Sequence, residues 1–225
     1  MQTPALIGGR ICVVGGPELT DPRDCMVYLL SIQGEQLLID AGAGPSAPAI
    51  LKNIERASPG AVLRTLVLTH GHIDHVGGAA EIKRRTGCRI VAHELDLDAI
   101  QGRNPSKSAE GWYGVRLEPV GVDDILRSEE ERRTVGGVEL HLLHTPGHTP
   151  GSIVVWADIE GKRVLFGQDI HGPFDPDFDS DIDEWRRSMS RVLALEADIL
   201  CEGHFGVFEG KERVKRFIEG YLREV

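Results

Sequence analysis

Short apolar segments rich in Val, Ile and Leu alternate along the chain with segments of helical periodicity. In the first half, the apolar runs predict strands at 11–14, 26–32, 36–39, 63–69 and 89–92. Residues 33–35 separate two of these strands and predict a hairpin turn. Apolar residues recur at helical spacing over 47–57, and a second helix is predicted at 78–86, where Gly87 ends it.

The alternation returns after an irregular stretch. Residues 101–137 contain scattered Gly, Pro, Ser and Asn without clear periodicity, which predicts a functional loop that forms a lip over the substrate. Further strands are predicted at 138–144, 152–157, 163–166 and 198–201. Helices are predicted at 211–223 and at 182–195, the latter preceded by the candidate caps Asp179, Ser180 and Asp181. Hairpins interleaved with helices indicate mixed sheets, and no compositional boundary divides the expected single domain over 1–225.

Composition and charge narrow the classes of partner. The 225 residues, 41% of them hydrophobic, can bury a core without disulfides, and the formal charge of −10 argues against nucleic acid. No stretch approaches the roughly 18 apolar residues of a membrane span, and the first ten residues do not resemble a secretion signal. The four scattered cysteines are expected to be free thiols in a cytoplasmic protein. A small molecule is the expected partner, and a homo-oligomer is compatible with the composition.

Candidate chemistry gathers where predicted strands end. Residues 69–75 read THGHIDH, so His70, His72, Asp74 and His75 fall within six residues. Imidazole and carboxylate together suit zinc, iron and manganese. Three imidazoles at this density favour a metal site over an ordinary polar loop.

Three more groups follow later strands. His148 lies in a rigid turn that reads TPGHTPGS, Asp169 ends the run FGQD, and His204 lies in EGHFG. Each is weak evidence alone, because a single Asp at a strand end is usually a turn or cap residue. Together with the first group they supply five His and two Asp, enough for two metal ions with positions open to water or substrate.

The order of these motifs resembles the metallo-β-lactamase-fold superfamily from about residue 40 to residue 206. The resemblance implies a four-layer αββα sandwich of two mixed sheets, with metals at one edge between them. It implies one metal held by His70, His72 and His148, and a second held by Asp74, His75 and His204. Asp169 would bridge the two metals. Asp40, in LIDAG, would support the ligand loop without binding metal itself.

The resemblance also implies a chemistry. Two close metals lower the pKa of a shared water, so a bridging hydroxide would hydrolyse a small ester, thioester or lactone, with Asp74 as the residue that orients it. We expect two divalent ions, zinc first, with iron and manganese as alternatives. A mono-iron persulfide dioxygenase-like oxidoreductase, which uses the same residue types, is the alternative function.

Departures from related groups favour one branch. Flavin-coupled di-iron members carry Glu where this chain has His72, and lactonases typically place Tyr where it has Gly172. Only 21 residues follow His204, which leaves no room for a helical glutathione-binding domain. The motifs resemble those of the glyoxalase II-like and lactonase-like branch, and we expect that branch without the glutathione-binding domain, although Gly172 argues against the lactonases themselves.

Substrate choice must come from residues outside a metal centre that the whole superfamily shares. Trp112 and Tyr113 stand side by side in the irregular stretch, and His171 and Phe174 closely follow Asp169. These four are the candidate substrate contacts. For the aromatic pair, packing onto the sandwich is an equal alternative. His93 ends a strand and is predicted to be a hydrogen-bonded structural residue.

Overall fold

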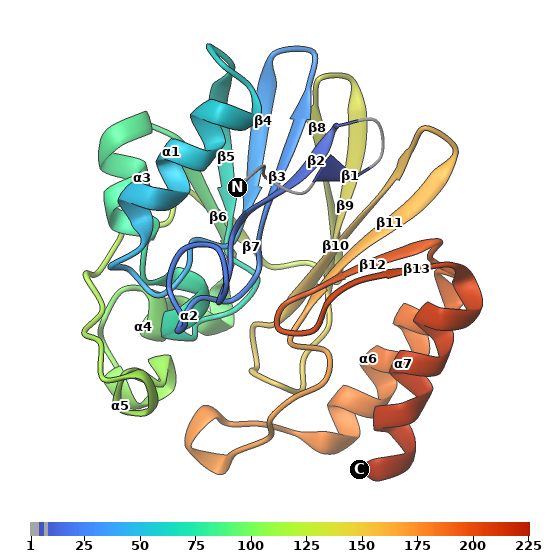
Figure 1. Cartoon of the computed structure of the whole chain (residues 1–225). Helices are drawn as coiled ribbons and strands as arrows, with labels where there is room; N and C mark the ends of the chain where they lie inside the picture. The colour runs from blue at the N-terminus through green and yellow to red at the C-terminus, as the bar shows by residue number, and fades with distance from the viewer. Residues whose placement is uncertain (1–4, 7–8) are drawn as a thin grey trace.

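Two β-sheets pack face to face in the computed structural model, which describes residues 5, 6 and 9–225 (Figure 1). The first sheet contains seven strands in chain order: β1 (Ala5–Leu6), β2 (Ile11–Gly15), β3 (Val27–Ile32), β4 (Glu35–Ile39), β5 (Val62–Val67), β6 (Arg89–His93) and β7 (Asp124–Leu126). Strands β1 to β4 pair antiparallel, whereas β4 to β7 pair parallel. The sheet is therefore mixed, as the hairpin followed by strand–helix alternation predicts.

The second sheet contains six strands in the order β13-β12-β11-β10-β9-β8. Their bounds are β8 (Glu130–Val135), β9 (Val138–His144), β10 (Ile153–Ile159), β11 (Lys162–Gln168), β12 (Ile199–Glu202) and β13 (Gly206–Glu209). Only β11 and β12 pair parallel. This sheet is mixed as well.

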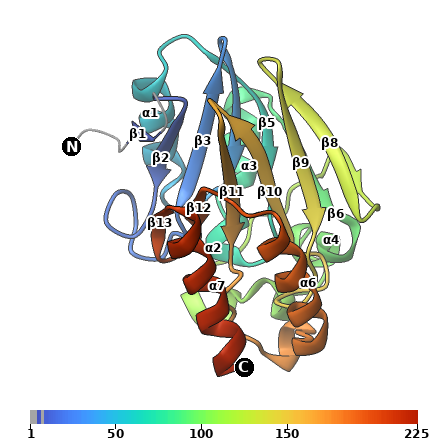
Figure 2. The ribbon, with the colours of Figure 1, turned by 90° about the vertical axis from the view of Figure 1, so that its right-hand side faces the viewer.

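Helices cover both outer faces of the sandwich (Figure 2). The first sheet carries α1 (Ala47–Ala57), α2 (Ile73–Val76), α3 (Ala79–Thr86), α4 (Leu97–Ile100) and α5 (Glu110–Tyr113), and the second carries α6 (Ile182–Ala194) and α7 (Lys211–Glu224). The Asp181 side chain caps α6 by accepting from the Glu184 backbone N–H at 2.9 Å, which confirms one of the three candidate caps. Gly87 ends α3 with φ of 71°, a conformation that favours glycine.

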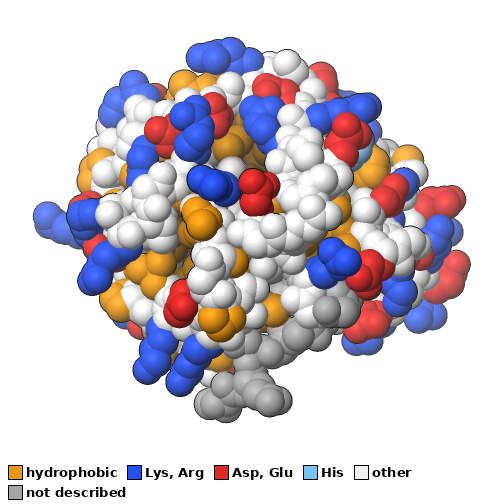
Figure 3. Space-filling model, turned by 90° about the horizontal axis from the view of Figure 1, so that it is seen from above, with side chains coloured by type: hydrophobic (Ala, Val, Ile, Leu, Met, Phe, Trp, Pro, Cys, Tyr) orange, Lys and Arg blue, Asp and Glu red, His pale blue; other side chains and the backbone are white. Residues whose placement is uncertain are grey.

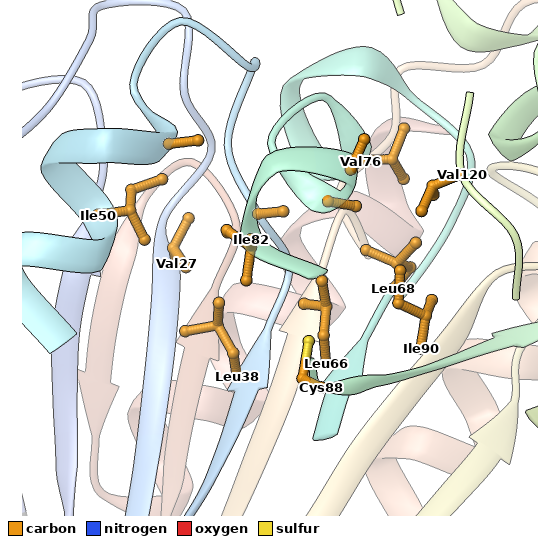
Figure 4. Packing of buried hydrophobic residues seen from close by; sticks show 14 of the residues in the cluster. Val27, Leu38, Ile50, Leu66, Leu68, Val76, Ile82, Cys88, Ile90 and Val120 are labelled. Atoms are coloured by element: carbon orange, nitrogen blue, oxygen red, sulfur yellow. The ribbon is translucent and has the colours of Figure 1, made fainter. Parts of the chain in front are cut away.

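Three layers of apolar side chains hold these elements together. In the layer shown in Figure 4, Ile50 and Ile82 from the helices meet Leu38 and Leu66 from the first sheet. A second layer fills the space between the sheets, and a third packs α6 and α7 onto the second sheet. This arrangement confirms the predicted four-layer αββα sandwich.

The prediction that residues 101–137 lack regular structure is wrong. This stretch contains α5, a short 3-10 turn at Pro105–Ser108, and the strands β7 and β8. Strands β7 and β8 lie at the edges of their sheets, and most side chains of β8 are at least partly exposed. An edge strand buries little, so charged residues replace the apolar run that marks a central strand. The charged residues 130–133 therefore form most of β8 and are exposed or half-buried.

Two further features of the described chain bear on its environment. All four cysteines are free, as predicted, and all four are buried. No helix among residues 5, 6 and 9–225 has the length and apolarity needed to cross a membrane.

The surface at the end of the sandwich seen in Figure 3 carries Lys and Arg side chains interspersed with Asp and Glu side chains.

Candidate metal centre

The predicted ligands gather at one edge of the sandwich because the strands that precede them point to the same edge. His70 follows β5, Asp169 follows β11 and His204 follows β12, and β11 and β12 are parallel neighbours. His148 lies in the turn between β9 and β10. In Figures 1 and 2, α2 and the turn after β12 lie on this edge. The structure thus brings together residues from distant parts of the chain.

The first group of donor atoms comes from three histidines and one carboxylate. Nδ1 of His72 lies 3.1 Å from Nε2 of His70 and 3.0 Å from Nε2 of His148. Oδ2 of Asp169 lies 3.8 Å from His70 Nε2 and 3.5 Å from His148 Nε2. Four donors around a tetrahedral zinc ion, at bond lengths of about 2.0–2.1 Å, stand roughly 3.3 Å apart. The observed spacing therefore fits one ion.

The second group contains two histidines and two carboxylates. Nε2 of His75 lies 3.4 Å from Asp74 Oδ2 and 3.1 Å from Asp169 Oδ1. Nε2 of His204 lies 3.3 Å from each of the same two oxygens. Asp169 therefore turns Oδ2 toward the first group and Oδ1 toward the second, so its carboxylate could bridge two ions.

Three donor atoms of the second group lack hydrogen-bond partners although they are buried: Asp74 Oδ2, His75 Nε2 and Asp169 Oδ1. Buried polar atoms without partners are costly, and two carboxylate oxygens facing the same point are especially so. A cation among these atoms would satisfy all three. The side chains of this centre therefore fit a metal by their chemistry, their spacing and their unsatisfied atoms.

Asp40 and Thr69 orient two of the histidines from behind. His75 Nδ1 donates to Asp40 Oδ2 at 2.6 Å, and the Thr69 hydroxyl donates to the same oxygen at 2.7 Å. Because its own proton is used in this way, the Thr69 hydroxyl accepts from His70 Nδ1, 3.2 Å away. Both rings then turn Nε2 toward the centre. The structure places Asp40 where the resemblance implied, behind the ligands.

A backbone carbonyl orients a third ring. His148 Nδ1 donates to the carbonyl of Pro173 at 2.7 Å, so its Nε2 lone pair faces the centre.

The backbone of Asp40 adopts a left-handed conformation with φ of 61°, which is uncommon for a residue other than glycine. Its hydrogen bonds to Thr69 and His75 hold it there.

The histidines of the first and second groups of donors differ in their protonation. Burial lowers the pKa of His70 and His148 and brings that of His72 to about 3, so these three rings are neutral donors. Burial alone would also lower the pKa of His204, but Asp169 and Asp74 raise it to about 10.

The carboxylates of the second group are ionised. Burial alone would raise the pKa of Asp74 and Asp169, but the charge of His75 and the close approach of His204 hold both pKa values below the usual range. Protons on His75 and His204 thus compete with a divalent cation for the same nitrogen atoms.

Asp96 is a supporting residue that the sequence did not reveal. Its Oδ2 accepts from the Gly71 backbone N–H at 2.8 Å and from the Thr149 hydroxyl at 2.7 Å. Its Oδ1 accepts from the Gly151 backbone N–H at 2.8 Å. Asp96 therefore ties the loop of His70 and His72 to the turn of His148. Its position shortly after β6 is the same strand-end signal that marks the other groups.

Glu202 is a second residue that sequence reasoning missed. It is fully buried, and its Oε2 accepts from the backbone N–H groups of His204 at 2.6 Å and Phe205 at 2.8 Å. Its Oε1 lies 2.6 Å from His171 Nδ1. Glu202 thus fixes the turn that carries His204 and holds the His171 ring.

Trp112 and Tyr113, predicted as substrate contacts, lie on the side of α2 and have different surroundings. Trp112 is 59% exposed and packs on Phe178, which in turn contacts the His72 ring. Tyr113 is partly buried against the helical side of the first sheet. Burial, with the adjacent charge of Asp74, raises the pKa of its hydroxyl. Trp112 is therefore free to meet a substrate, whereas Tyr113 is also a packing residue.

The other two predicted substrate contacts, His171 and Phe174, also have different surroundings. The His171 ring lies against those of His204 and Phe205, at centroid distances of 5.4 and 5.0 Å, and so borders the centre. Phe174 packs edge-on against Trp185 under α6, with centroids 5.0 Å apart. This placement favours a packing role for Phe174.

The chain belongs to the metallo-β-lactamase superfamily, because residues 20–204 match the model of that family. This finding agrees with the fold and with the resemblance of the five motifs.

The chain is also similar to individual proteins whose names describe metallo-hydrolases or metallo-β-lactamases. A probable metallo-hydrolase of Bacillus subtilis (strain 168), YybB, is 30% identical over 166 residues, which cover 70% of this chain and 72% of that protein. A hydroxyacylglutathione hydrolase of Anaeromyxobacter dehalogenans (strain 2CP-C) is 31% identical over 148 residues, 66% of this chain and 47% of that protein. Among solved structures, a metallo-β-lactamase of Cronobacter sakazakii with a HARLDQ motif superposes with a TM-score of 0.83 at 24% identity, covering 100% of this chain and 92% of that one. At 24% identity, the similarity to the Cronobacter sakazakii structure shows a shared fold and nothing more.

Proposed function

We propose that this chain is a binuclear metallohydrolase that cleaves a small ester, thioester or lactone. The observation that carries the proposal is the Asp169 carboxylate, whose two oxygens face two separate groups of donors. Membership of the superfamily and similarity to a probable metallo-hydrolase support metal-dependent hydrolysis. Partial similarity to a hydroxyacylglutathione hydrolase supports an ester or thioester bond as the target.

Each group of donors is assigned one ion in this proposal. His70, His72 and His148 would hold the first, and Asp74, His75 and His204 the second. Asp169 would contact both. Tetrahedral sites of His and carboxylate donors are typical of zinc, and iron and manganese accept the same donors. When bound, two such ions polarise a carbonyl and lower the pKa of water, so that hydroxide is available near neutral pH.

The residues of the chain position the reactants. Asp74 is ionised, and His75 and His204 face its Oδ2, so its carboxylate lies where it can accept a hydrogen bond from the attacking water. His75 lies beside this oxygen, and Asp40 fixes the orientation of the ring. The His171 ring, held at Nδ1 by Glu202, borders the centre where a substrate would enter.

Water is the proposed nucleophile because no thiol of the chain can take that role. All four cysteines are buried, and burial raises the pKa of each. A thiol that stays protonated and inaccessible is a poor nucleophile. We therefore assign the attacking group to solvent.

The alternative function, oxygenation at a single iron, uses fewer of these residues. One ion held by two His and one Asp would leave part of the seven-residue set without a metal. The unsatisfied Asp74 Oδ2 and His75 Nε2 atoms therefore favour two ions.

The proposal is tested by assaying protein purified without chelator on thioesters, lactones and phosphodiesters. We expect hydrolysis of a thioester, an ester or a lactone, loss of activity after chelation, and recovery when zinc is restored. The His148→Ala variant should stay inactive after zinc is restored, whereas Asp98→Asn, at an exposed helix position, should behave as the wild type. Hydrolysis that survives complete chelation, or oxygen consumption on a thiol-derived substrate without hydrolysis, would overturn it.

A further inference from the structure

A cavity of about 480 Å³ adjoins the metal centre. It lies between the loop that follows β2 and the turn between β12 and β13, two segments that run side by side in Figures 1 and 2. His204 lines this cavity and also belongs to the second group of donors. The cavity therefore opens beside the atoms at which hydrolysis would occur.

The lining of this cavity is predominantly apolar. Its larger side chains are Pro17, Leu19, Met26 and Phe205, and the Phe205 side chain is 54% exposed. The lining contains one carboxylate, Glu18, and no Lys or Arg among the described residues. An apolar group would bury hydrocarbon surface here, whereas an anionic group would meet a like charge without a compensating cation.

We propose that this cavity, here called the Leu19–Phe205 cavity, binds an uncharged apolar acyl group of the substrate. The inference rests on the proposed function and narrows it to esters, thioesters or lactones whose acyl part is a hydrocarbon chain. Its volume falls within the range of about 300–1,000 Å³ that is usual for small-ligand sites. Acyl groups that end in a carboxylate are disfavoured by the same lining.

The walls of the cavity are fixed before any substrate arrives. The Leu19 and Thr20 backbone N–H groups donate to the Gly16 carbonyl at 3.0 and 2.9 Å, which closes the turn. The Thr20 hydroxyl donates to Asp24, a buried carboxylate that also accepts from the Ala43 backbone N–H at 2.7 Å. A preformed wall spares the substrate the cost of ordering the loop.

The two walls are also tied to each other and to the metal centre. The Met26 backbone N–H donates to the Gly203 carbonyl at 2.7 Å, which joins the loop after β2 to the turn of His204. The Cys25 backbone N–H donates to the Asp74 carbonyl at 3.2 Å. The position of the cavity relative to His204 and Asp74 is therefore fixed by main-chain bonds.

The first test compares zinc-loaded wild type on p-nitrophenyl acetate, butyrate, hexanoate and octanoate. Burial of each CH₂ should raise kcat/KM by up to about fourfold until the cavity is filled. A hexanoyl ester whose far end carries a carboxylate should lose this gain. The Leu19→Glu and Phe205→Ala variants should flatten the dependence on chain length, whereas Val62→Glu, at an exposed strand position elsewhere, should retain it.

The second test does not depend on turnover. Chelator-treated protein is titrated with octanamide, an uncharged probe, by isothermal calorimetry. We expect saturable binding by wild type and by Val62→Glu, and weakened binding by Phe205→Ala, whose exposed side chain can be removed without opening the core. Absence of octanamide binding together with equal kcat/KM along the ester series would overturn the inference and leave the hydrolase assignment intact. Octanamide binding without hydrolysis of any ester, thioester or lactone would overturn the hydrolase assignment instead.

Discussion

Asp40 Oδ2 accepts a hydrogen bond from His75 Nδ1 at 2.6 Å, and both side chains are completely buried. This contact turns the Nε2 atom of His75 toward Asp74 and Asp169. Through Thr69, the same carboxylate orients His70 in the other group of donors. One residue behind the centre therefore orients a donor in each group.

Replacing Asp40 by Asn should weaken metal binding without removing a ligand. The amide would present an N–H toward either Thr69 or His75, both of which donate to the carboxylate in the wild type. Loss of such a supporting hydrogen bond typically lowers metal affinity about 10- to 100-fold. Zinc dissociation constants from chelator competition measure the effect, with Asp98→Asn as the control at an exposed position. An unchanged affinity would show that Asp40 does not orient His75.

Replacing Asp96 by Asn should loosen two ligand loops together. Asn has one acceptor oxygen, so one of the N–H groups of Gly71 and Gly151 would lose its partner in a buried site. An unsatisfied buried donor costs about 1–3 kcal/mol of unfolding free energy. Urea unfolding of the metal-free chain measures this loss. Stability equal to that of the wild type would contradict the role given to Asp96.

Trp112 and Tyr113 should respond differently to substitution. Trp112 is exposed and contacts Phe178, so Trp112→Ala should raise KM or change substrate preference while kcat and zinc content stay near wild-type values. Tyr113→Ala should in addition lower stability, because that ring packs against the core. Steady-state kinetics on each hydrolysed substrate, together with thermal unfolding, separate the two effects. Unchanged kinetics for Trp112→Ala would remove this loop as a specificity element.

His93 should make stability depend on pH in the acid range. Burial lowers its folded-state pKa to about 4, and its Nδ1 accepts from the Leu95 backbone N–H at 3.4 Å. Between about pH 4 and the unfolded value near 6.5 the unfolded chain binds the extra proton, so stability falls as pH falls. The loss should reach at most about 3 kcal/mol and should diminish in His93→Gln. Unfolding free energies of chelator-treated wild type and variant at pH 4.5 and 7 test this difference, and parallel pH profiles would contradict it.

The central strands were predictable from the sequence, and the edge strands were not. Strands such as β3 and β10 carry runs of buried apolar residues, and their pattern is clear. Strands β7, β8 and β13 lie at sheet edges and contain few buried side chains. Their pairing depends on neighbours that are distant in sequence, which a local pattern does not contain.

The residues of the candidate site were likewise only partly predictable from the sequence. His70 and His72 stand out because they cluster in the sequence, and the order of motifs links them to His148 and His204. Asp96 and Glu202 are single acidic residues without such a cluster. Their importance lies in hydrogen bonds to loops that become neighbours only in the folded chain. The Leu19–Phe205 cavity likewise joins two segments from opposite ends of the sequence.

The metal-to-protein ratio tests the central claim most directly. We propose measuring it by elemental analysis in the wild type and in Asp169→Asn, both purified without chelator. We expect about two zinc ions per wild-type chain and loss of the second ion in the variant, because an amide weakens the bridge between the two groups. One iron per wild-type chain, or two zinc ions retained by Asp169→Asn with full turnover, would contradict it.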